Sequence, residues 1–447
     1  MPDAAPRPRL ADHLRVAWLL VGTLLGAIPF TFFLIASPIL TPWLRARTRR
    51  KLGGEPAAPT DAPALADLPE NATIFIVAGE ASGDELAASV VRELRARAPD
   101  VRIRGYGGPA LTAAGAELDE DIVERAVMGF FPVVASLGTW WKLCARTLAR
   151  LREEPPDLML TVDFPGLNVR LASWARAQGV RTVHLVAPQI WAHTPWRILR
   201  WRKAVDRLLA TFPYEPALFA AAQIPTTFVG HPLFEAPLPA PRGAAQHPGD
   251  AEAIVEIWPG SRRKEIDRIT PLLVEAASLV EEQHPRVRFV VRLARASLEE
   301  RFRHAARAAR WSPSSISFTT ETRPSYDAPL FGAIATSGTA TAQLAVDLVP
   351  VAIVYRLGFV SWFFAHGLVT APFIALPNLA LGRRAVPERL VWAPNAGERV
   401  ARDFLGLVSE PADFDRVHAD LVEVRRRLEA PDVAARAAGW VLAELAQ

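Results

Sequence analysis

The stretch that decides the fold is Ile74-Phe75-Ile76-Val77-Ala78-Gly79-Glu80-Ala81-Ser82-Gly83-Asp84-Glu85. Its apolar half predicts a buried strand, and the small residues after it predict a turn into a helix over residues 85–97. Small residues let a ligand approach the backbone, and the free N–H groups at a helix start favour an anion. An alternative interpretation needs no ligand, because Ser82 and Glu85 have the spacing of a capping box. Glu80 and Asp84 favour a site, since they bring carboxylates to one strand end.

The same alternation of strand and helix continues outward from this stretch. Because strands that alternate with helices form βαβ units, the pattern predicts an α/β fold with parallel sheets. Two doubly wound, Rossmann-like domains are expected to face each other across a cleft at the carboxyl ends of their strands. The expected strands of the first domain are 73–78, 101–105, 158–162, 182–186 and 207–211, and those of the second are 254–258, 287–293, 333–336 and 351–355.

Composition changes along the chain predict six segments. Stretches rich in Pro and Ala without periodicity are read as linkers. The C-terminal tail has the pattern of a charged amphipathic helix, which is expected to pack on the first domain or on a partner. The segments are an N-terminal membrane anchor with a basic flank (1–51), a linker (52–70), a first Rossmann-like domain (71–235), a second linker (236–250), a second Rossmann-like domain (251–410) and a helical tail (411–447).

Charge and cysteine content exclude several classes of protein. The 447 residues are 50% hydrophobic and 22% charged, which excludes a disordered chain. Cys144 is the one cysteine, so no internal disulfide forms and a reducing compartment is favoured. The net charge of +4 is local, because residues 1–51 hold eight Lys and Arg but only Asp3 and Asp12 as acids. A nucleic-acid footprint over the rest of the chain is therefore not expected.

Residues 16–44 contain no charged side chain and are rich in Leu, Ile, Phe, Val and Trp. A helix of this length exceeds the roughly 20 residues that span a bilayer, so a membrane anchor is expected. Pro29, Pro38 and Pro42 imply a kink, or a segment that enters the membrane and turns back. The basic residues of 45–51 place the C-terminal side of this segment in the cytoplasm. The alternative, a cleaved signal peptide, has a shorter apolar run.

A second strand end carries the sequence Val162-Asp163-Phe164-Pro165-Gly166. Asp163 is expected to point into the cleft, where a carboxylate shielded from water can act as a general base on a hydroxyl. In the alternative interpretation Asp163 only caps the next helix, and Asn168 only satisfies the backbone of the loop.

The second domain repeats this pattern with basic residues and hydroxyls. Cations at 262–264 follow a strand and a Gly-Ser turn, and Arg pairs the oxygens of a diphosphate in a fork. The turn at 337–341 opens a helix and can donate backbone N–H groups to phosphate without a metal. A solvated basic loop and simple helix capping are the respective alternatives.

The sequence gives little indication of a metal-binding site. Residues 119–121 are Asp-Glu-Asp, but they follow no apolar strand and are interpreted as surface acids. The histidines have no metal-ligand spacing, and a lone cysteine cannot build a thiolate site. No cofactor is therefore expected. The aromatic stretch 128–141 is read either as a membrane-interface or acyl-chain contact or as a buried helix.

From about residue 73 to residue 390 the sequence resembles lipid-A-disaccharide synthase, a glycosyltransferase family of the GT-B type. The resemblance is carried by a series of short motifs that occur in the same order along the chain, more than by any single motif. These pieces are AGEASGD (78–84), GYGGP (105–109), VMGF (127–130), PDLMLTVDFPGLN (156–168), APQIWA (187–192), VGHPL (229–233), PGSRRKEI (259–266), SGTAT (337–341) and LPNLALG (376–382).

The resemblance implies a GT-B architecture and a reaction. The 2,3-diacylglucosamine unit of UDP-2,3-diacylglucosamine would pass, with inversion, to the 6-hydroxyl of 2,3-diacylglucosamine 1-phosphate (lipid X), releasing UDP without a metal. It also implies action at the cytoplasmic face of the inner membrane, where the N-terminal segment would anchor the chain. A second copy of the chain is a candidate partner.

The resemblance also implies roles for particular residues. Asp163 would be the base, with Glu80 and Asp84 beside it in the catalytic group, while Arg262 and the 337–341 turn would meet the diphosphate. The expected substrate-binding residues are Ser82, Asn168, Arg262, Glu265, Ser337, Gly338, Thr339, Gln343, Asn378 and Glu388.

The chain departs from the family pattern at four positions. Gln343 and Pro132 stand where a Glu is usual, Val391 replaces a Gln, and His193 replaces a Trp. Gln343 can still hydrogen-bond a ribose, but Pro132 and Val391 cannot replace their counterparts. Two alternatives follow: a related UDP-sugar transferase with a different lipid acceptor, and a catalytically silent, membrane-anchored paralogue.

Overall fold

The chain forms two compact α/β units. The computed structural model describes residues 7–25, 27–64, 67–123, 137–244, 247, 251–309, 311, 316–358, 362, 365, 367–392 and 396–447. Unit 1 comprises Met1–Leu40, Pro56–Glu235 and Ala430–Gln447, and unit 2 comprises Thr41–Glu55 and Ala236–Glu429. The expected α/β class with two parallel-sheet domains is thereby confirmed.

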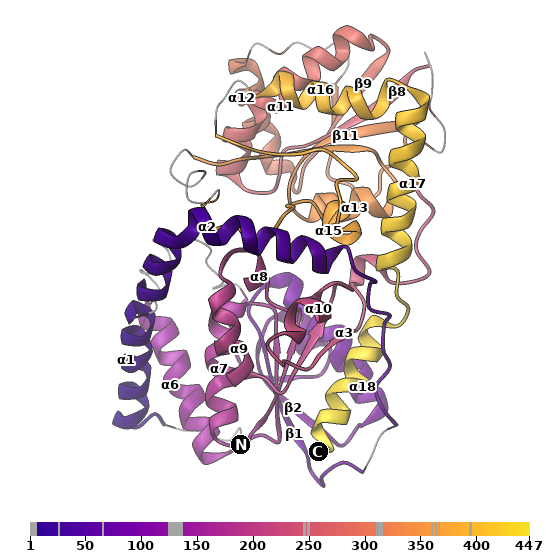
Figure 1. Cartoon of the computed structure of the whole chain (residues 1–447). Helices are drawn as coiled ribbons and strands as arrows, with labels where there is room; N and C mark the ends of the chain where they lie inside the picture. Colours follow the sequence, from indigo (N-terminus) through magenta and orange to yellow (C-terminus); the bar gives the residue numbers. More distant parts are fainter. Residues whose placement is uncertain are drawn as a thin grey trace. The chain divides into compact units, whose positions relative to one another are not determined.

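Unit 1 is built on a seven-stranded parallel sheet (Figure 1). The strand order is β3-β2-β1-β4-β5-β6-β7, so the order reverses between β1 and β4. Ligands bind at such a reversal in open parallel sheets, because the helices on either side diverge there. The strands are β1 (Thr73–Ala78), β2 (Arg102–Gly107), β3 (Glu117–Asp121), β4 (Leu158–Val162), β5 (Arg181–Leu185), β6 (Arg207–Ala210) and β7 (Thr226–Phe228).

Helices cover both faces of this sheet because successive strand residues point to opposite sides. Ile74 and Ile76 of β1 pack in a cluster with α3 (Ala81–Arg97) and α18 (Val433–Leu445). Phe75 and Val77 pack instead with α6 (Leu137–Glu153) and α7 (Pro165–Ala177). The other helical segments of unit 1 are α1 (Leu10–Leu25), α4 (Pro109–Ala113), α8 (Ile190–His193), η1 (Pro195–Arg197), α9 (Ile198–Ala204), α10 (Glu215–Ala220) and η2 (Pro232–Phe234).

Unit 2 holds a six-stranded parallel sheet of order β10-β9-β8-β11-β12-β13, which reverses between β8 and β11. Its strands are β8 (Ala253–Trp258), β9 (Val287–Arg292), β10 (Ile316–Thr319), β11 (Leu330–Thr336), β12 (Val351–Arg356) and β13 (Glu388–Val391). Its helical segments are α11 (Arg263–Gln283), η3 (Ala296–Leu298), α12 (Glu299–Ala308), α13 (Thr339–Val346), α15 (Leu376–Leu381), α16 (Gly397–Val408) and α17 (Pro411–Leu428). The helix α2 (Ala27–Leu52) contributes residues to both units.

Four short strands escaped the sequence analysis: β3, β7, β10 and β13. Residues 119–121 lie at the surface as predicted, and they belong to β3, the edge strand paired with β2. Asp119 forms ion pairs with Arg104 and Arg150. Short edge strands with charged side chains lack the apolar pattern on which strand prediction depends.

The capping-box alternative for Ser82 and Glu85 was also wrong. The helix α3 begins at Ala81 with Glu80 as its N-cap, so Ser82 lies inside the first turn. Ser82 is exposed there and is available to a ligand.

The N-terminal segment forms α1 and α2 rather than one long apolar helix. Among the helices in the described part of the chain, none is long and apolar enough to cross a membrane.

One face of α2 is buried against the protein. Phe33, Ser37, Thr41 and Thr48 are buried and recur at helical spacing. Within unit 2 the Thr41 hydroxyl donates to the carbonyl of Gly367, and the guanidinium of Arg45 donates to that of Val369 at 2.7 Å.

The C-terminal residues 411–447, expected as one tail, are shared between the units. The helix α17 belongs to unit 2, whereas α18 belongs to unit 1 and packs against α3 (Figure 1). Ala437, Val441 and Leu442 of α18 are buried in the core of unit 1.

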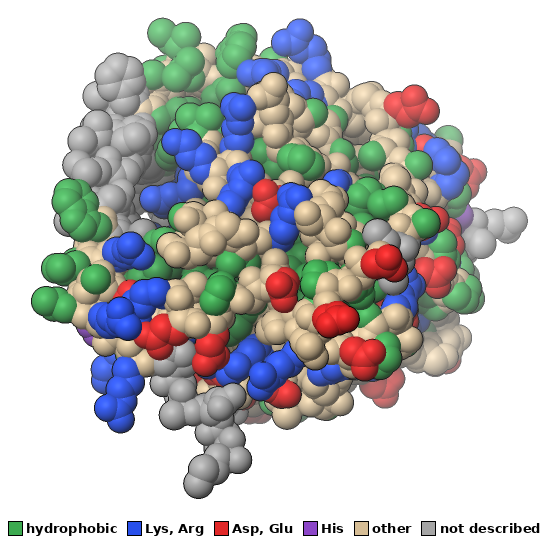
Figure 2. Space-filling model, turned by 90° about the horizontal axis from the view of Figure 1, so that it is seen from below, with side chains coloured by type: hydrophobic (Ala, Val, Ile, Leu, Met, Phe, Trp, Pro, Cys, Tyr) green, Lys and Arg blue, Asp and Glu red, His purple; other side chains and the backbone are tan. Residues whose placement is uncertain are grey.

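Charged side chains of both signs are intermingled on the face drawn in Figure 2. A mixed surface gives no long-range field of one sign. That the body of the chain does not bind nucleic acid stays a prediction.

Candidate active site

The candidate site of unit 1 lies at the carboxyl edge of its sheet. Strands β1 and β4 are neighbours, with Ala78 opposite Val162. Gly79 and Asp163 follow these partners directly, so the two strand-end motifs of the sequence lie at the point where the strand order reverses.

Close packing holds the two motifs together. A Cβ on Gly79 would come within 2.6 Å of the Phe164 ring, and one on Gly83 would lie 3.6 Å from the Cβ of Asp163. The absence of side chains at these glycines therefore lets the start of α3 lie directly against Asp163.

The backbone at Asp163 is held in an unusual conformation. Asp163 and Phe164 have φ angles of +47° and +46°, in the left-handed region that non-glycine residues rarely adopt. The Asp163 amide donates to the carbonyl of Leu185 at 2.9 Å. Such strain persists only where the surroundings fix it, and it is concentrated at functional sites.

Burial raises the pKa of Asp163, although a backbone hydrogen bond from Phe164 opposes the shift. A carboxylate with a raised pKa is a stronger base than an exposed one. Asp163 lines a cavity of about 420 Å³ at the carboxyl ends of β4, β5 and β6. The structure therefore gives this residue both the access and the basicity that its predicted role needs.

Asn168 holds the backbone of this strand end. Its side chain is fully buried and donates to the carbonyls of Val162 and Asp163 at 3.1 and 2.7 Å. These bonds agree with the alternative that Asn168 satisfies the backbone of the loop, and substrate contact by this residue stays a prediction.

Asp84 likewise holds backbone groups. Its carboxylate accepts from the amides of Gly108 and Ala110 at 2.7 and 2.9 Å. A Cβ on Gly108 would lie 2.8 Å from an Asp84 oxygen, which explains the glycines of the GYGGP piece. Direct catalysis by Asp84 is not what this geometry indicates, because both carboxylate oxygens are occupied in fixing the turn before α4. Glu80, half-buried, remains at the edge of the site.

The cavity around Asp163 also contains basic residues that sequence analysis missed. Arg170, His193, Arg197 and Arg200 all line it. The basic character of residues 197–203 was the available signal, but spacing alone does not tell which face of a short helix meets a cavity.

A separate cavity of about 460 Å³ lies at the carboxyl edge of the unit 2 sheet. It brings together most of the residues predicted to bind the donor. Those lining it are Arg262, Glu265, Ser337, Gly338, Thr339 and Gln343.

Two turns shape this cavity. Gly260 has a φ angle of +93°, and a Cβ there would lie 2.8 Å from a Glu265 carboxylate oxygen. Gly338, with φ of +151°, is the N-cap of α13, whose first N–H groups need acceptors from outside the helix. Ser337 donates through its hydroxyl to Ile374 at 3.4 Å. The cavity thus combines a helix N-terminus with the exposed guanidinium of Arg262, a pairing that suits phosphate.

Asn378 and Glu388, predicted to bind the donor, fix the backbone near this cavity. Fully buried, Asn378 accepts from the amides of Ala385 and Val386 at 2.7 and 2.9 Å. Glu388 accepts from the amides of Ile374 and Ala375. Neither residue is among those that line the cavity, and direct donor contact stays a prediction for both.

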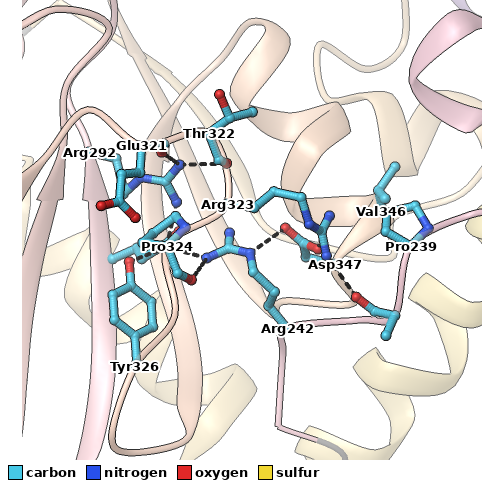
Figure 3. Close-up of polar contacts among 12 residues, drawn as sticks. Pro239, Arg242, Arg292, Glu321, Thr322, Arg323, Pro324, Tyr326, Val346 and Asp347 are labelled. Atoms are coloured by element: carbon cyan, nitrogen blue, oxygen red, sulfur yellow. Dashed lines mark hydrogen bonds and ion pairs between the residues drawn. The ribbon is translucent and has the colours of Figure 1, made fainter.

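A buried ionic network supports one wall of the cavity (Figure 3). Glu256 is fully buried and accepts from Arg292 at 2.7 Å and from Arg242 at 3.1 Å. Burial alone would raise the pKa of Glu256, but these guanidinium groups hold it below its ordinary value. Figure 3 shows Arg292 directed at the carbonyls of Glu321 and Thr322, to which it donates at 2.7 and 2.9 Å. Both of these loop residues line the cavity.

The four residues that depart from the family pattern lie in different parts of the structure. Gln343 is half-buried and lines the donor-side cavity, whereas Val391 lies in β13 opposite Arg356. His193 lines the cavity of unit 1. Pro132 and the VMGF piece lie outside the described residues.

Among the described residues, no group of three or more His, Cys, Asp or Glu side chains is placed to hold a metal ion. Independence of a metal stays a prediction.

Two parallel α/β units, each with a polar cavity at the carboxyl ends of its strands and one of them suited to a diphosphate, indicate a protein that acts on a nucleotide-linked substrate. The sequence profile of the family described as lipid-A-disaccharide synthetase matches residues 74–410. The chain therefore belongs to the lipid-A-disaccharide synthase family and is a glycosyltransferase of lipid A biosynthesis.

Individual relatives agree with this assignment. The chain is 33% identical over 378 residues to lipid-A-disaccharide synthase of Geobacter metallireducens, covering 83% of this chain and 97% of that one. It is 38% identical over 389 residues to the Azotobacter vinelandii enzyme of the same name, covering 84% and 98%. Among solved structures, it is similar to UDP-GlcNAc 2-epimerase from Neisseria meningitidis bound to UDP-GlcNAc, with a TM-score of 0.46, 12% identity and coverage of 83% and 97%.

Proposed function

We propose that this chain transfers the 2,3-diacylglucosamine unit of UDP-2,3-diacylglucosamine to the 6-hydroxyl of 2,3-diacylglucosamine 1-phosphate. The products are a β-linked disaccharide 1-phosphate and UDP. The observation that carries the proposal is the strained, partly buried Asp163, which lines a cavity at the strand reversal of unit 1.

Asp163 accepts the proton of the acceptor hydroxyl as that oxygen attacks the anomeric carbon of the donor. Its raised pKa strengthens the base, and Asn168 holds its backbone in place. Attack from the face opposite the leaving group inverts the anomeric configuration.

The donor-side residues stabilise the charge that develops on the leaving diphosphate. Arg262 and the backbone N–H groups at the start of α13 meet this charge, which increases as the bond to the sugar breaks. The proposal therefore needs no metal.

We place the enzyme at the cytoplasmic face of the inner membrane, held there by the N-terminal helices. Leu10, Leu14 and Trp18 lie one turn apart on α1 and are 76%, 56% and 71% exposed. On α2, Trp43 is exposed just before the basic residues 45–51, which suit anionic headgroups. Replacement of Trp18 and Trp43 by Ser should weaken co-flotation with anionic vesicles, and unchanged flotation would refute this placement.

A related transferase with another lipid acceptor is the second candidate function. Gln343 favours it, because an amide in the donor-side cavity pairs a ribose hydroxyl more weakly than the usual carboxylate does. Product masses from a panel of acceptors with different acyl chains separate the two candidates. A second copy of the chain is the proposed protein partner, which light scattering after size exclusion tests.

The reaction is tested by measuring UDP release. Wild-type protein should release UDP only when both lipid sugars are present, and Asp163→Asn should remove this release. Asp100→Asn, at an exposed carboxylate of unit 1, serves as the matched control and should keep wild-type rates. Normal turnover by Asp163→Asn would remove Asp163 from the mechanism.

A further inference from the structure

The cavity around Asp163 has walls from three neighbouring strand ends of unit 1. Asp163 follows β4, residues 186–190 follow β5, and Thr211 and Phe212 follow β6. The remaining wall comes from the first half of α7 and from the segment α8 to α9. The cavity therefore opens at the edge of the sheet where parallel α/β proteins bind ligands.

The part of the cavity wall that comes from α7 and from the segment α8 to α9 is basic. Arg170 of α7, Arg197 at the end of η1 and Arg200 of α9 reach the cavity, and His193 joins them. Asp163 is the one carboxylate among the described residues that line it. One acid cannot neutralise three guanidinium groups, so the cavity has an excess of positive charge.

Arg197 and Arg200 differ from many other arginines of the chain, which form ion pairs with carboxylates. Arg301 and Arg389, for example, are paired with Asp267 and Asp403. By contrast, no carboxylate of the described residues forms an ion pair with Arg197 or Arg200.

The cations also repel one another. Burial lowers the pKa of Arg170, and the charges of Arg200 and Arg197 lower it further. Burial and the charge of Arg200 likewise lower the pKa of Arg197. An anion placed among these groups would relieve the repulsion and form charge-assisted, bidentate hydrogen bonds.

The structure of the acceptor sugar explains why a site for an anion would lie in the same cavity as the base. In a glucosamine 1-phosphate, the carbon that carries the phosphate and the carbon that carries the hydroxymethyl group both adjoin the ring oxygen. A 6-hydroxyl that reaches Asp163 therefore brings the phosphate of the same sugar close to it. One cavity holding both a base and arginines meets this requirement.

We propose that Arg170, Arg197 and Arg200 form the subsite that binds the phosphate monoester of the acceptor sugar, with His193 at its edge. This inference rests on the proposed function for the identity of the acceptor. Arg170 donates a hydrogen bond to the carbonyl of Gly166, one turn earlier in α7, at 2.6 Å, which holds its guanidinium beside the cavity. The subsite selects phosphorylated acceptors and sets the orientation of the hydroxyl toward Asp163.

The test compares acceptors with and without the 1-phosphate. In the Arg197→Ala/Arg200→Ala variant, KM for the phosphorylated acceptor should rise about tenfold or more, as expected for lost hydrogen bonds to a charged group. KM for the UDP-sugar should not change, and kcat/KM for the unphosphorylated acceptor should equal that of the wild type. Arg197→Lys/Arg200→Lys should restore part of the affinity, and Arg92→Ala, at an exposed arginine of α3, should behave as wild type.

Each other outcome overturns the proposal in a distinguishable way. An equal loss with both acceptors, together with a lower melting temperature, assigns the arginines a structural role. A rise in the KM for the UDP-sugar assigns them to the donor diphosphate. Loss of binding to phosphatidylglycerol vesicles with an unchanged acceptor KM in detergent assigns them to membrane headgroups.

Calorimetry with soluble probes separates this inference from the proposed function. If wild-type protein turns over neither acceptor, the proposed function fails, but the subsite can still be measured. Glucosamine 1-phosphate should then bind the wild type more tightly than glucosamine, and this difference should disappear in Arg197→Ala/Arg200→Ala. Equal binding of the two probes by the wild type would refute the subsite.

Discussion

Asp163 illustrates how a single side chain acquires its chemistry from its place in the chain. The apolar strand before it brings it to the sheet edge, the Pro-Gly turn after it ends the strand, and burial raises its pKa. Its position was predictable because an apolar run ending in a turn marks a strand end. Its left-handed backbone was not, since only the surrounding contacts impose it.

The raised pKa of Asp163 predicts the pH dependence of the reaction. A general base must be ionised, so kcat/KM should fall as pH decreases through the pKa of Asp163, which lies above its ordinary value of 3.8. Asp163→Asn should cost roughly 10²- to 10⁴-fold in kcat across the whole range. A pH–rate profile checks this, and an acid limb that persists unchanged in Asp163→Asn would contradict it.

Glu215 predicts a pH dependence of stability. Burial raises its pKa to about 8 from an ordinary 4.5, although backbone hydrogen bonds from Phe212 and Thr211 oppose the shift. Between these values the unfolded chain loses the proton while the folded chain keeps it, so stability falls as pH rises. Relative to Glu215→Gln, the wild type should lose melting temperature from about pH 5 to about pH 8. A difference that is flat with pH would contradict the assignment.

The hydrogen-bond partners of several polar residues could not be predicted from sequence. Asp84, Asn168 and Asn378 have the side chains that a sugar would need, but each binds backbone amides or carbonyls of its own unit. Which partner such a side chain meets depends on loops distant in sequence. Arg197 and Arg200 were missed for the same reason, since the packing of α8 and α9 decides that they reach the cavity.

Among the secondary-structure elements, the buried strands were predicted most accurately from sequence. β1 and β4 match their predicted bounds, because their apolar runs are buried on both faces of a parallel sheet. The sequence also held a signal for the buried ion pair. Glu256 lies within the apolar run of β8 and Arg292 ends β9, and a buried charge needs a partner of opposite sign.

Arg292 provides the prediction at this scale. Arg292→Ala removes the donor that holds the carbonyls of Glu321 and Thr322, so the cavity wall should loosen and KM for the UDP-sugar should rise about tenfold. Steady-state kinetics with kcat and KM separated measures the effect. Arg288→Ala, on the same strand but paired with Asp327 at the surface, is the control. Equal KM values in both variants would show that the network does not support the donor site.

The whole molecule is not a simple succession of domains. The chain contributes to unit 1, passes into unit 2 along α2, and returns to unit 1 twice, the second time to end in α18. Composition along the chain could not predict this division, because a segment with the composition of a linker does not have to lie at a boundary between two folded units. The long apolar run at 16–44 does not form one spanning helix among the described residues, and part of its apolar surface packs on the protein, as Val16 and Phe33 do.

Truncation after Glu429 tests this return of the chain. It removes α18, whose Ala438, Val441 and Leu442 are buried against β-strands and α3 of unit 1. Unit 1 should lose several kcal/mol of stability, since each large buried aliphatic contributes roughly 1.5–3 kcal/mol. Limited proteolysis should then cut first within residues 56–235, whereas cleavage confined to unit 2 would contradict the assignment of α18 to unit 1.

The central claim is that this chain joins two lipid-linked glucosamines with inversion. The most direct test is to incubate purified protein with UDP-2,3-diacylglucosamine and 2,3-diacylglucosamine 1-phosphate, then analyse the lipid product by mass spectrometry and proton NMR. We predict a single disaccharide 1-phosphate with a β-linkage to the 6-oxygen, formed by wild type and not by Asp163→Asn. UDP release that yields only free diacylglucosamine, or an α-linked product, would contradict the account.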